Sequence, residues 1–240
     1  RAGRRAEVGV PPASERLHLP GSLALPGLTD LHIHGAGGVD FDHCDAAGFE
    51  RASAMLASHG VTQALATLLP PPGGRWIERL AQVRTWLERC DRSPVFCGVH
   101  LEGPFLNPEM PGAIRREDLW PPDRARAESL SDALGPWLKL MTISPELPGA
   151  LEIIRRGTAR GVVMSAGHST ASCERIGEAI AAGVRQVTHL FNAMPPAHHR
   201  NPGILGAALT RPELLAQLIA DGVHVHPVML GLALRAKGRD

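Results

Sequence analysis

The chain has 240 residues, of which 44% are hydrophobic, and its 25 basic and 24 acidic side chains leave a formal net charge of +1. This composition allows one large globular domain with a sizeable core. The near-neutral balance gives no electrostatic basis for binding nucleic acid or an anionic membrane. Because no apolar run reaches the roughly 18 residues of a membrane span and no secretion signal is recognised, we expect a soluble cytoplasmic protein.

The cysteines and histidines indicate which chemistry to expect of the chain. The 4 cysteines include no Cys-x-x-Cys pair, so reduced thiols are expected rather than a disulfide framework or a structural zinc knot. The 12 histidines exceed average usage, and several lie in apolar surroundings. This excess is the compositional hint of metal chemistry.

Apolar runs alternate with amphipathic segments along most of the chain. Residues 1–24, rich in Pro, Gly and Arg, are predicted to be loop or the remnant of an accessory element. Strands are predicted near 25–31, 61–68, 95–101, 137–143, 161–166, 185–190 and 214–220. Helices are predicted over about 46–59, 74–90, 123–133, 147–160 and 170–182.

Continuous apolar strands alternating with helices favour an α/β fold, with a parallel sheet covered on its outer side by helices. The size suits a TIM-like (β/α)8 barrel over residues 25–240. The pattern gives about seven β/α repeats where a closed barrel has eight, so the eighth strand is expected to be missing.

Residues with metal-ligand side chains follow several of these strands. His32 and His34 stand two apart at the end of the first strand, which directs both imidazoles to one side. Glu102, at the end of the third strand, is costly to bury unless it is paired or bound to a metal. His168 and His189 follow the fifth and sixth strands. The alternative for each residue alone is a solvated turn histidine, a capping-loop histidine or a surface glutamate.

Together these side chains predict a metal site, because parallel strands bring their carboxyl ends to one face. Imidazoles and a carboxylate converging there can hold one or two divalent ions, with zinc expected, and activate a water molecule. Ser169 or Thr170 is expected to cap the helix after His168.

Two further segments suggest substrate recognition. Residues 221–225, Asp-Gly-Val-His-Val, are predicted to end the seventh strand and so to place His224 at the same rim. Asn192, Ala193 and Arg200 follow His189, where an arginine could form a forked contact with a phosphate. The simpler interpretation of Arg200 alone is a solvated loop cation.

The strings Pro-Gly-Leu-Thr-Asp-Leu-His-Ile-His-Gly (26–35), His-Leu-Glu-Gly-Pro-Phe (100–105) and Thr-His-Leu-Phe-Asn-Ala-Met (188–194) resemble the N-acetylglucosamine-6-phosphate deacetylases of the amidohydrolase superfamily. Gly-His-Ser (167–169) and residues 221–225 extend the resemblance in the same order. The first string is shared across amidohydrolases, whereas the second and third are specific to the deacetylases.

The resemblance implies metal-dependent removal of acetate from an amino-sugar phosphate by a homodimer. It implies that Glu102, His168 and His189 hold the main ion and that His32 and His34 hold a second one. It also implies that substrate is bound by Asn192, Ala193, Arg200 and His224, with His224 able to stabilise an oxyanion.

The chain departs from the family pattern in three places. Ile114 stands where family members usually have a histidine. No Thr-Asp-Ala-like string with the acid/base aspartate of the eighth strand follows His224. Most of the accessory β-sandwich built from both termini is missing. We therefore identify no acid/base residue and expect a chain truncated at both ends.

Two alternatives stay open at this point. One is another amidohydrolase, dihydroorotase-like or D-aminoacylase-like, acting on a different amide. The other is an inactive fragment that binds metal or sugar phosphate without the aspartate.

Overall fold

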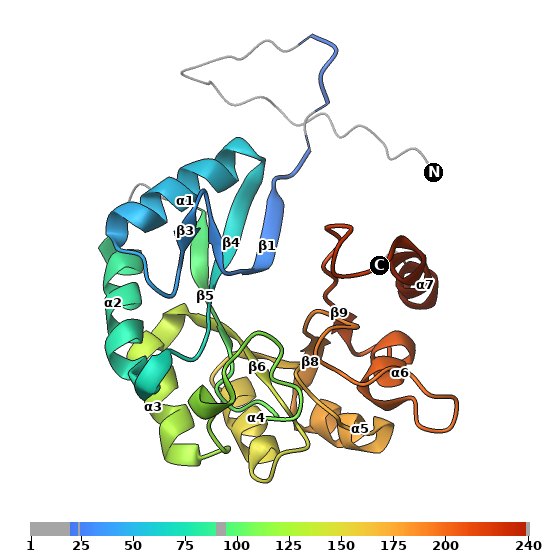
Figure 1. Ribbon diagram of the computed structural model, residues 1–240. Helices are drawn as coiled ribbons and strands as arrows, with labels where there is room; N and C mark the ends of the chain where they lie inside the picture. The colour runs from blue at the N-terminus through green and yellow to red at the C-terminus, as the bar shows by residue number, and fades with distance from the viewer. Residues whose placement is uncertain (1–19, 24, 90–94, 239–240) are drawn as a thin grey trace.

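The computed structural model describes residues 20–23, 25–89 and 95–238, which form a curved parallel sheet with helices on its outer side (Figure 1). The sheet has 7 strands in the order β1-β4-β5-β6-β7-β8-β9, and every pairing in it is parallel. The strands are β1 (Leu28–Ile33), β4 (Val61–Leu68), β5 (Phe96–Glu102), β6 (Leu138–Ile143), β7 (Val163–Ala166), β8 (Val184–Val187) and β9 (Leu215–Ala216). The predicted α/β fold is confirmed.

A helix follows most of these strands and returns the chain to the start of the next one. The helices are α1 (Ala46–Ser58), α2 (Trp76–Arg89), α3 (Arg124–Leu134), α4 (Ala150–Ala159), α5 (Cys173–Ala182), α6 (Gly203–Thr210) and α7 (Pro227–Lys237). A small antiparallel pair, β2 (Gly35–Ala36) and β3 (Val39–Asp40), and three short 3-10 turns, η1 (Pro72–Gly74), η2 (Arg116–Asp118) and η3 (Gly135–Trp137), complete the described elements.

Side-chain caps explain where several helices begin. The carboxylates of Asp45 and Asp123 accept hydrogen bonds from the first turns of α1 and α3. At α5 the cap is Ser172, whose hydroxyl accepts from the backbone N–H of Arg175. The prediction that Ser169 or Thr170 caps this helix is therefore wrong, because α5 begins three to four residues later, at Cys173.

The core lies between the sheet and the helices. At its α1 end, the rings of Phe41, Phe49 and Phe96 meet with centroids 5.1 to 5.3 Å apart. All three side chains are buried. Such aromatic contacts add to the stabilisation from burial itself. This cluster packs α1 against β5, the strand that ends in Glu102.

The sheet is an open, curled half-barrel. Within the described residues, β1 pairs only with β4 and β9 pairs only with β8, so the two edge strands carry unpaired backbone (Figure 1). The seventh strand is shorter than predicted, since β9 ends at Ala216. The proposed remnant over 1–24 lies outside the described residues except for 20–23, which are exposed. None of the described helices is both long and apolar enough to cross a membrane.

Truncation of the aromatic cluster tests how far it stabilises the fold. We expect Phe49→Ala to lower the free energy of unfolding by about 3–5 kcal/mol, because it leaves a cavity among buried rings. Urea denaturation followed by circular dichroism measures the change. Met55→Ala, on the same helix at a residue that is 42% exposed, is the matched control and should change the stability by under about 1 kcal/mol. Equal effects of the two substitutions would contradict this view of the core.

Candidate metal centre

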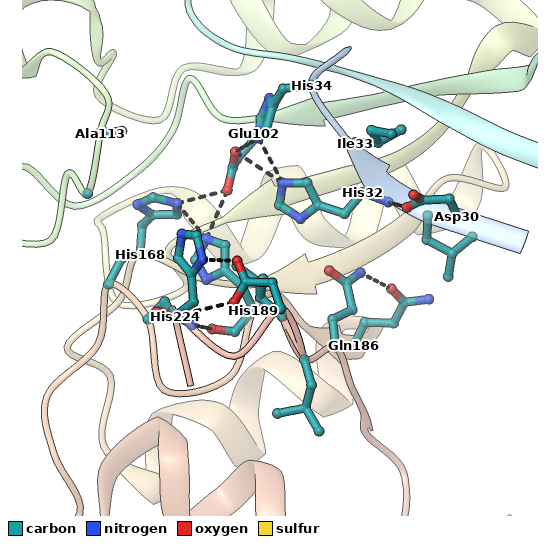
Figure 2. Close-up of a pocket in the computed structure, with 18 of the residues that line it drawn as sticks. Asp30, His32, Ile33, His34, Glu102, Ala113, His168, Gln186, His189 and His224 are labelled. Atoms are coloured by element: carbon teal, nitrogen blue, oxygen red, sulfur yellow. Dashed lines mark hydrogen bonds and ion pairs between the residues drawn. The ribbon is translucent and has the colours of Figure 1, made fainter. Parts of the chain in front are cut away.

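Five predicted ligand residues meet at the carboxyl end of the sheet. His32 lies in β1, His34 follows it, and Glu102 is the last residue of β5. His168 and His189 lie two residues beyond the ends of β7 and β8. Figure 2 shows the four imidazoles pointing toward the Glu102 carboxylate, with His32 and His34 from the end of β1 and the others from beyond β7 and β8. The predicted convergence of these side chains is confirmed.

The first group of ligand atoms is buried. Glu102 Oε1 lies 3.0 Å from His168 Nε2 and 2.9 Å from His189 Nε2, and these two nitrogens are 3.0 Å apart. The exposed fractions of the three residues are 4%, 3% and 7% respectively. We call Glu102, His168 and His189 the inner group.

The second group shares the same carboxylate through its other oxygen. Glu102 Oε2 lies 3.3 Å from His32 Nε2 and 3.2 Å from His34 Nε2. The two nitrogens are 3.1 Å apart, so both imidazoles lie on the same side of the chain. This outer group, Glu102 with His32 and His34, is more open, since the His34 side chain is 43% exposed.

Glu102 is the negative centre of both groups. Burial alone would raise the pKa of its carboxyl, but hydrogen bonds with His168, His189, His32 and His34 outweigh burial and hold that pKa well below its usual range. Burial opposes protonation of His34, yet its hydrogen bond with Glu102 and the nearby negative charges raise the pKa of this imidazole. The site therefore presents an ionised carboxylate to whatever binds there.

The hydrogen bonding of His168 tests whether the inner group fits a cation. His168 Nδ1 lies 2.8 Å from the carbonyl oxygen of Met110, which can only accept, so Nδ1 carries a hydrogen. In the neutral ring, Nε2 then directs a lone pair at the Glu102 oxygen 3.0 Å away. Two acceptors repel each other at this distance unless a proton or a cation lies between them.

The spacing also suits an ion. Ligand atoms 2.9 to 3.0 Å apart can share one ion at the metal–ligand distances of about 2.0–2.2 Å found for zinc. Both groups combine histidine nitrogen with carboxylate oxygen, a donor set suited to zinc and related divalent metals. The residues present therefore fit a divalent ion.

A chain of buried hydroxyls and one imidazole lies beneath the candidate ligands. His100 Nδ1 contacts Thr67 Oγ1 at 3.2 Å, and its Nε2 contacts Thr142 Oγ1 at 2.8 Å. The chain continues from Thr142 to Thr188 over 2.8 Å and from Thr188 to Ser165 over 2.6 Å. Burial holds the pKa of His100 well below its usual range, so this imidazole is a neutral bridge between strands rather than a cation.

Backbone conformations of low population cluster at the site. Among the described non-glycine residues, positive φ angles occur at His168 (48°), His189 (32°), Phe191 (82°) and Ala193 (50°). Each such residue costs about 1–3 kcal/mol and persists only where its surroundings hold it. The loops after β7 and β8 are also joined, since Ser169 N–H donates to the carbonyl of Ala193 over 3.2 Å.

A cavity of about 1250 Å³ opens above the ligands. Its wall includes Ile114 and Gln186 together with residues of β1 and the segment after β9. Much of its volume therefore lies between the two open edges of the sheet. Ile114 is buried and gives the cavity an apolar surface where the family resemblance implies a histidine.

Asn192 and Ala193 line this cavity. The Asn192 backbone N–H is already bonded to the carbonyl of His189 over 2.9 Å. The Ala193 N–H makes no hydrogen bond with any residue the structure describes. Ala193 is thus better placed than Asn192 to offer a backbone donor to a ligand.

The other two predicted substrate residues lie differently. His224 lines the cavity but does not follow a strand, because β9 ends before residues 221–225 begin. Its Nδ1 lies 2.7 Å from Asp221 Oδ2, which fixes the ring at the rim. Arg200 is exposed outside the cavity wall, and its guanidinium has no partner in the part of the chain that the structure describes.

A family model described as "Amidohydrolase family" matches residues 23–239. The chain belongs to the amidohydrolase family. This agrees with the parallel half-barrel and with histidines and a glutamate at its carboxyl end.

Individual relatives give a more specific comparison than the family model does. The chain is 36% identical over 231 residues to N-acetylglucosamine-6-phosphate deacetylase of Bacillus subtilis, covering 95% of this chain and 58% of that protein. The Thermotoga maritima deacetylase structure matches with a TM-score of 0.83 at 34% identity, covering 94% of this chain and 60% of that one. A mutant of the Mycobacterium smegmatis deacetylase, in complex with N-acetyl-D-glucosamine-6-phosphate, matches with a TM-score of 0.82 at 33% identity, covering 92% and 59%. The chain thus spans little more than half the length of these relatives.

Sequence reasoning missed several polar residues around the ligands. Thr67, Thr142 and Ser165 lie within strands, where a hydroxyl side chain gives no distinct signal. Glu146 follows β6 and contacts the residues next to His168. Its place just after a strand end was the one available signal, and it is the same signal that identified Glu102.

Asp42, beside the outer group, links two loops through a hydrogen bond. Its Oδ1 accepts the backbone N–H of Leu69, a residue of the cavity wall, over 2.9 Å. Burial raises the pKa of Asp42 to about 6, although the Leu69 N–H partly offsets this. The folded state therefore holds a proton on Asp42 at pH values where the unfolded chain, with an aspartate pKa of about 3.9, has released it.

This difference predicts a pH dependence of stability. Because the pKa of Asp42 is higher in the folded state, its protonated form stabilises the fold fully below about pH 4. This contribution to the free energy of unfolding is lost as the pH rises toward about 6. Asp42→Asn keeps an acceptor for Leu69 but cannot ionise, so we expect it to be more stable than wild type above pH 6, by about 1–2 kcal/mol after allowance for partial exposure. Urea unfolding from pH 4 to 7.5 measures this, and parallel profiles of the two proteins would contradict it.

Proposed function

We propose that this chain carries the metal centre of a hydrolase that converts N-acetyl-D-glucosamine 6-phosphate into D-glucosamine 6-phosphate and acetate. The observation that carries the proposal is the inner group. Glu102, His168 and His189 come from the ends of three strands, and their ligand atoms lie close to one another. Similarity to deacetylases over most of the chain supports the substrate class.

In this proposal the inner group holds the principal ion and the outer group holds a second one. A bound divalent ion, zinc in our expectation, supplies polarisation of the amide carbonyl and a water that is ionised near neutral pH. Glu102 provides the negative charge that both positions share, and the carbonyl of Met110 keeps the Nε2 lone pair of His168 directed at the ion position. The buried chain through His100 keeps the strands beneath the ligands in register.

The amino-sugar phosphate would occupy the cavity above the ligands. The N–H of Ala193 and the side chain of Asn192 lie on its wall and are proposed to bind the sugar. His224, held by Asp221, is proposed to contact substrate or a developing oxyanion. Arg200 is the proposed phosphate contact, which requires its exposed side chain to turn toward the cavity. The buried Ile114 offers only an apolar contact.

The proton transfers need an acid/base group that we do not identify in this chain. We propose that an eighth strand, lying between β1 and β9, supplies an aspartate there. The unpaired edges of both strands and the greater length of the relatives support this. The barrel over residues 25–240 and a β-sandwich remnant over 1–24 belong to the same proposal, as do a homodimer and a cytoplasmic location.

A specific alternative is a protein that binds the metal without turnover. Zinc content and acetate release, measured on this chain and on one extended by an eighth strand with its aspartate, separate the two. We expect the extended protein to release acetate from N-acetyl-D-glucosamine 6-phosphate and to leave cyclic amides unchanged. An extended, metal-loaded but inert protein would support the alternative, and turnover of cyclic amides would indicate another amidohydrolase.

Removal of a ligand tests the metal site directly. His168→Ala and His189→Ala each delete one of the three inner-group donors, so we expect zinc affinity to fall more than about 100-fold, beyond the loss seen for residues that only support ligands. Competition with a chromophoric chelator measures the affinity. His59→Ala, at an exposed histidine after α1, is the matched control and should bind zinc as wild type does. Unchanged affinity in both inner-group variants would refute the assignment.

A further inference from the structure

The backbone of His168 needs support from its neighbours because its φ angle is 48°. Part of that support comes from Ser144, whose hydroxyl lies 2.7 Å from the carbonyl of His168 and 3.0 Å from that of Gly167. Ser144 is fully buried and also accepts the backbone N–H of Asn107 over 2.8 Å. The loops after β5, β6 and β7 are thus joined at this residue.

Glu146 holds the residues that follow His168. Its Oε2 accepts the hydroxyl of Ser169 over 2.7 Å, and its Oε1 accepts the backbone N–H of Thr170 over 2.8 Å. These bonds fix the backbone immediately after His168, the residue with the positive φ angle.

The same carboxylate holds the loop that orients the His168 ring. Glu146 Oε1 accepts Asn107 Nδ2 over 2.8 Å, and Asn107 Oδ1 accepts the N–H of Glu109 over 2.9 Å. This loop presents the Met110 carbonyl to His168 Nδ1. Of the four clustered histidines, only His168 has an Nδ1 hydrogen bond within the described residues.

We propose that Glu146 is a positioning residue that fixes both the backbone and the ring of His168, and so sets the metal affinity of the inner group. This inference rests on the proposed metal site and deepens it. Glu146 does not contact Glu102, His168 or His189 directly. It acts through Ser169 and Thr170 on one side and through Asn107 and Met110 on the other.

The hydrogen bonds of Glu146, rather than its charge, carry this role. Within the described residues no lysine or arginine pairs with it, and its donors are two hydroxyls, one backbone N–H and one amide. A glutamine can keep Oε1 as an acceptor for Thr170 and Asn107, and its amide can donate to Ser169, since a hydroxyl also accepts. An alanine leaves all four donors without this partner.

The test compares Glu146→Gln and Glu146→Ala in the whole chain. We expect Glu146→Ala to weaken zinc binding about 10–100-fold, as for other partners of metal ligands. Glu146→Gln should stay within about fivefold of wild type, because neutral hydrogen bonds are weaker but present. Chelator competition measures zinc affinity, and the visible spectrum with Co²⁺ alone reports a changed coordination. Glu152→Ala, on the surface of α4 and paired there with Arg156, is the control and should match wild type.

The outcomes separate this inference from the function on which it rests. A wild-type chain that binds neither Zn²⁺ nor Co²⁺ overturns the proposed function. A wild-type chain that binds zinc while Glu146→Ala binds it equally well overturns the positioning role alone, as does a Glu146→Gln variant as weak as Glu146→Ala. If Glu146→Ala does not fold, Ser169→Ala removes one of the four bonds. It should then weaken zinc binding severalfold, and unchanged affinity would count against the proposal.

Discussion

The structure around the site depends on one buried carboxylate. Glu102 is 4% exposed and faces four imidazoles, two at each oxygen. A carboxylate that far from water is tolerated only where charge or hydrogen-bond donors surround it. The strands β1, β5, β7 and β8 must therefore stay in register at their carboxyl ends. The buried chain through His100 runs from Thr67 of β4 to Thr188 just beyond β8, and the Ile33 N–H of β1 donates to the Thr67 hydroxyl.

Around this centre the backbone adopts conformations that ordinary residues avoid. Two of the four positive φ angles belong to ligands themselves, His168 and His189. Around His168, hydrogen bonds from the buried Ser144 and the half-buried Glu146 hold the segment. The strained backbone at the candidate ligands therefore depends on the polar network behind them. This is expected for a site whose geometry is set before anything binds.

The open side of the half-barrel shapes the remainder of the site. The cavity runs between β1 and the segment after β9, so the proposed substrate residues on that side have less support than the candidate ligands do. His224 illustrates this, because Asp221 at the exposed rim holds it rather than a strand. Arg200 lies farther out still. The five candidate ligands are thus held by strands and buried bonds, whereas this side of the cavity is not.

Much of this could be predicted from the sequence, for a physical reason. Strand and helix periodicity is local, and parallel topology places every strand end on one face. The amino-acid pattern alone was therefore enough to group five candidate ligands: His32, His34, Glu102, His168 and His189. Only the tertiary structure decided which Glu102 oxygen faces which pair of histidines, that β9 ends before His224, and that Glu146 supports His168. These features depend on contacts between loops far apart in the chain, and no local pattern encodes them.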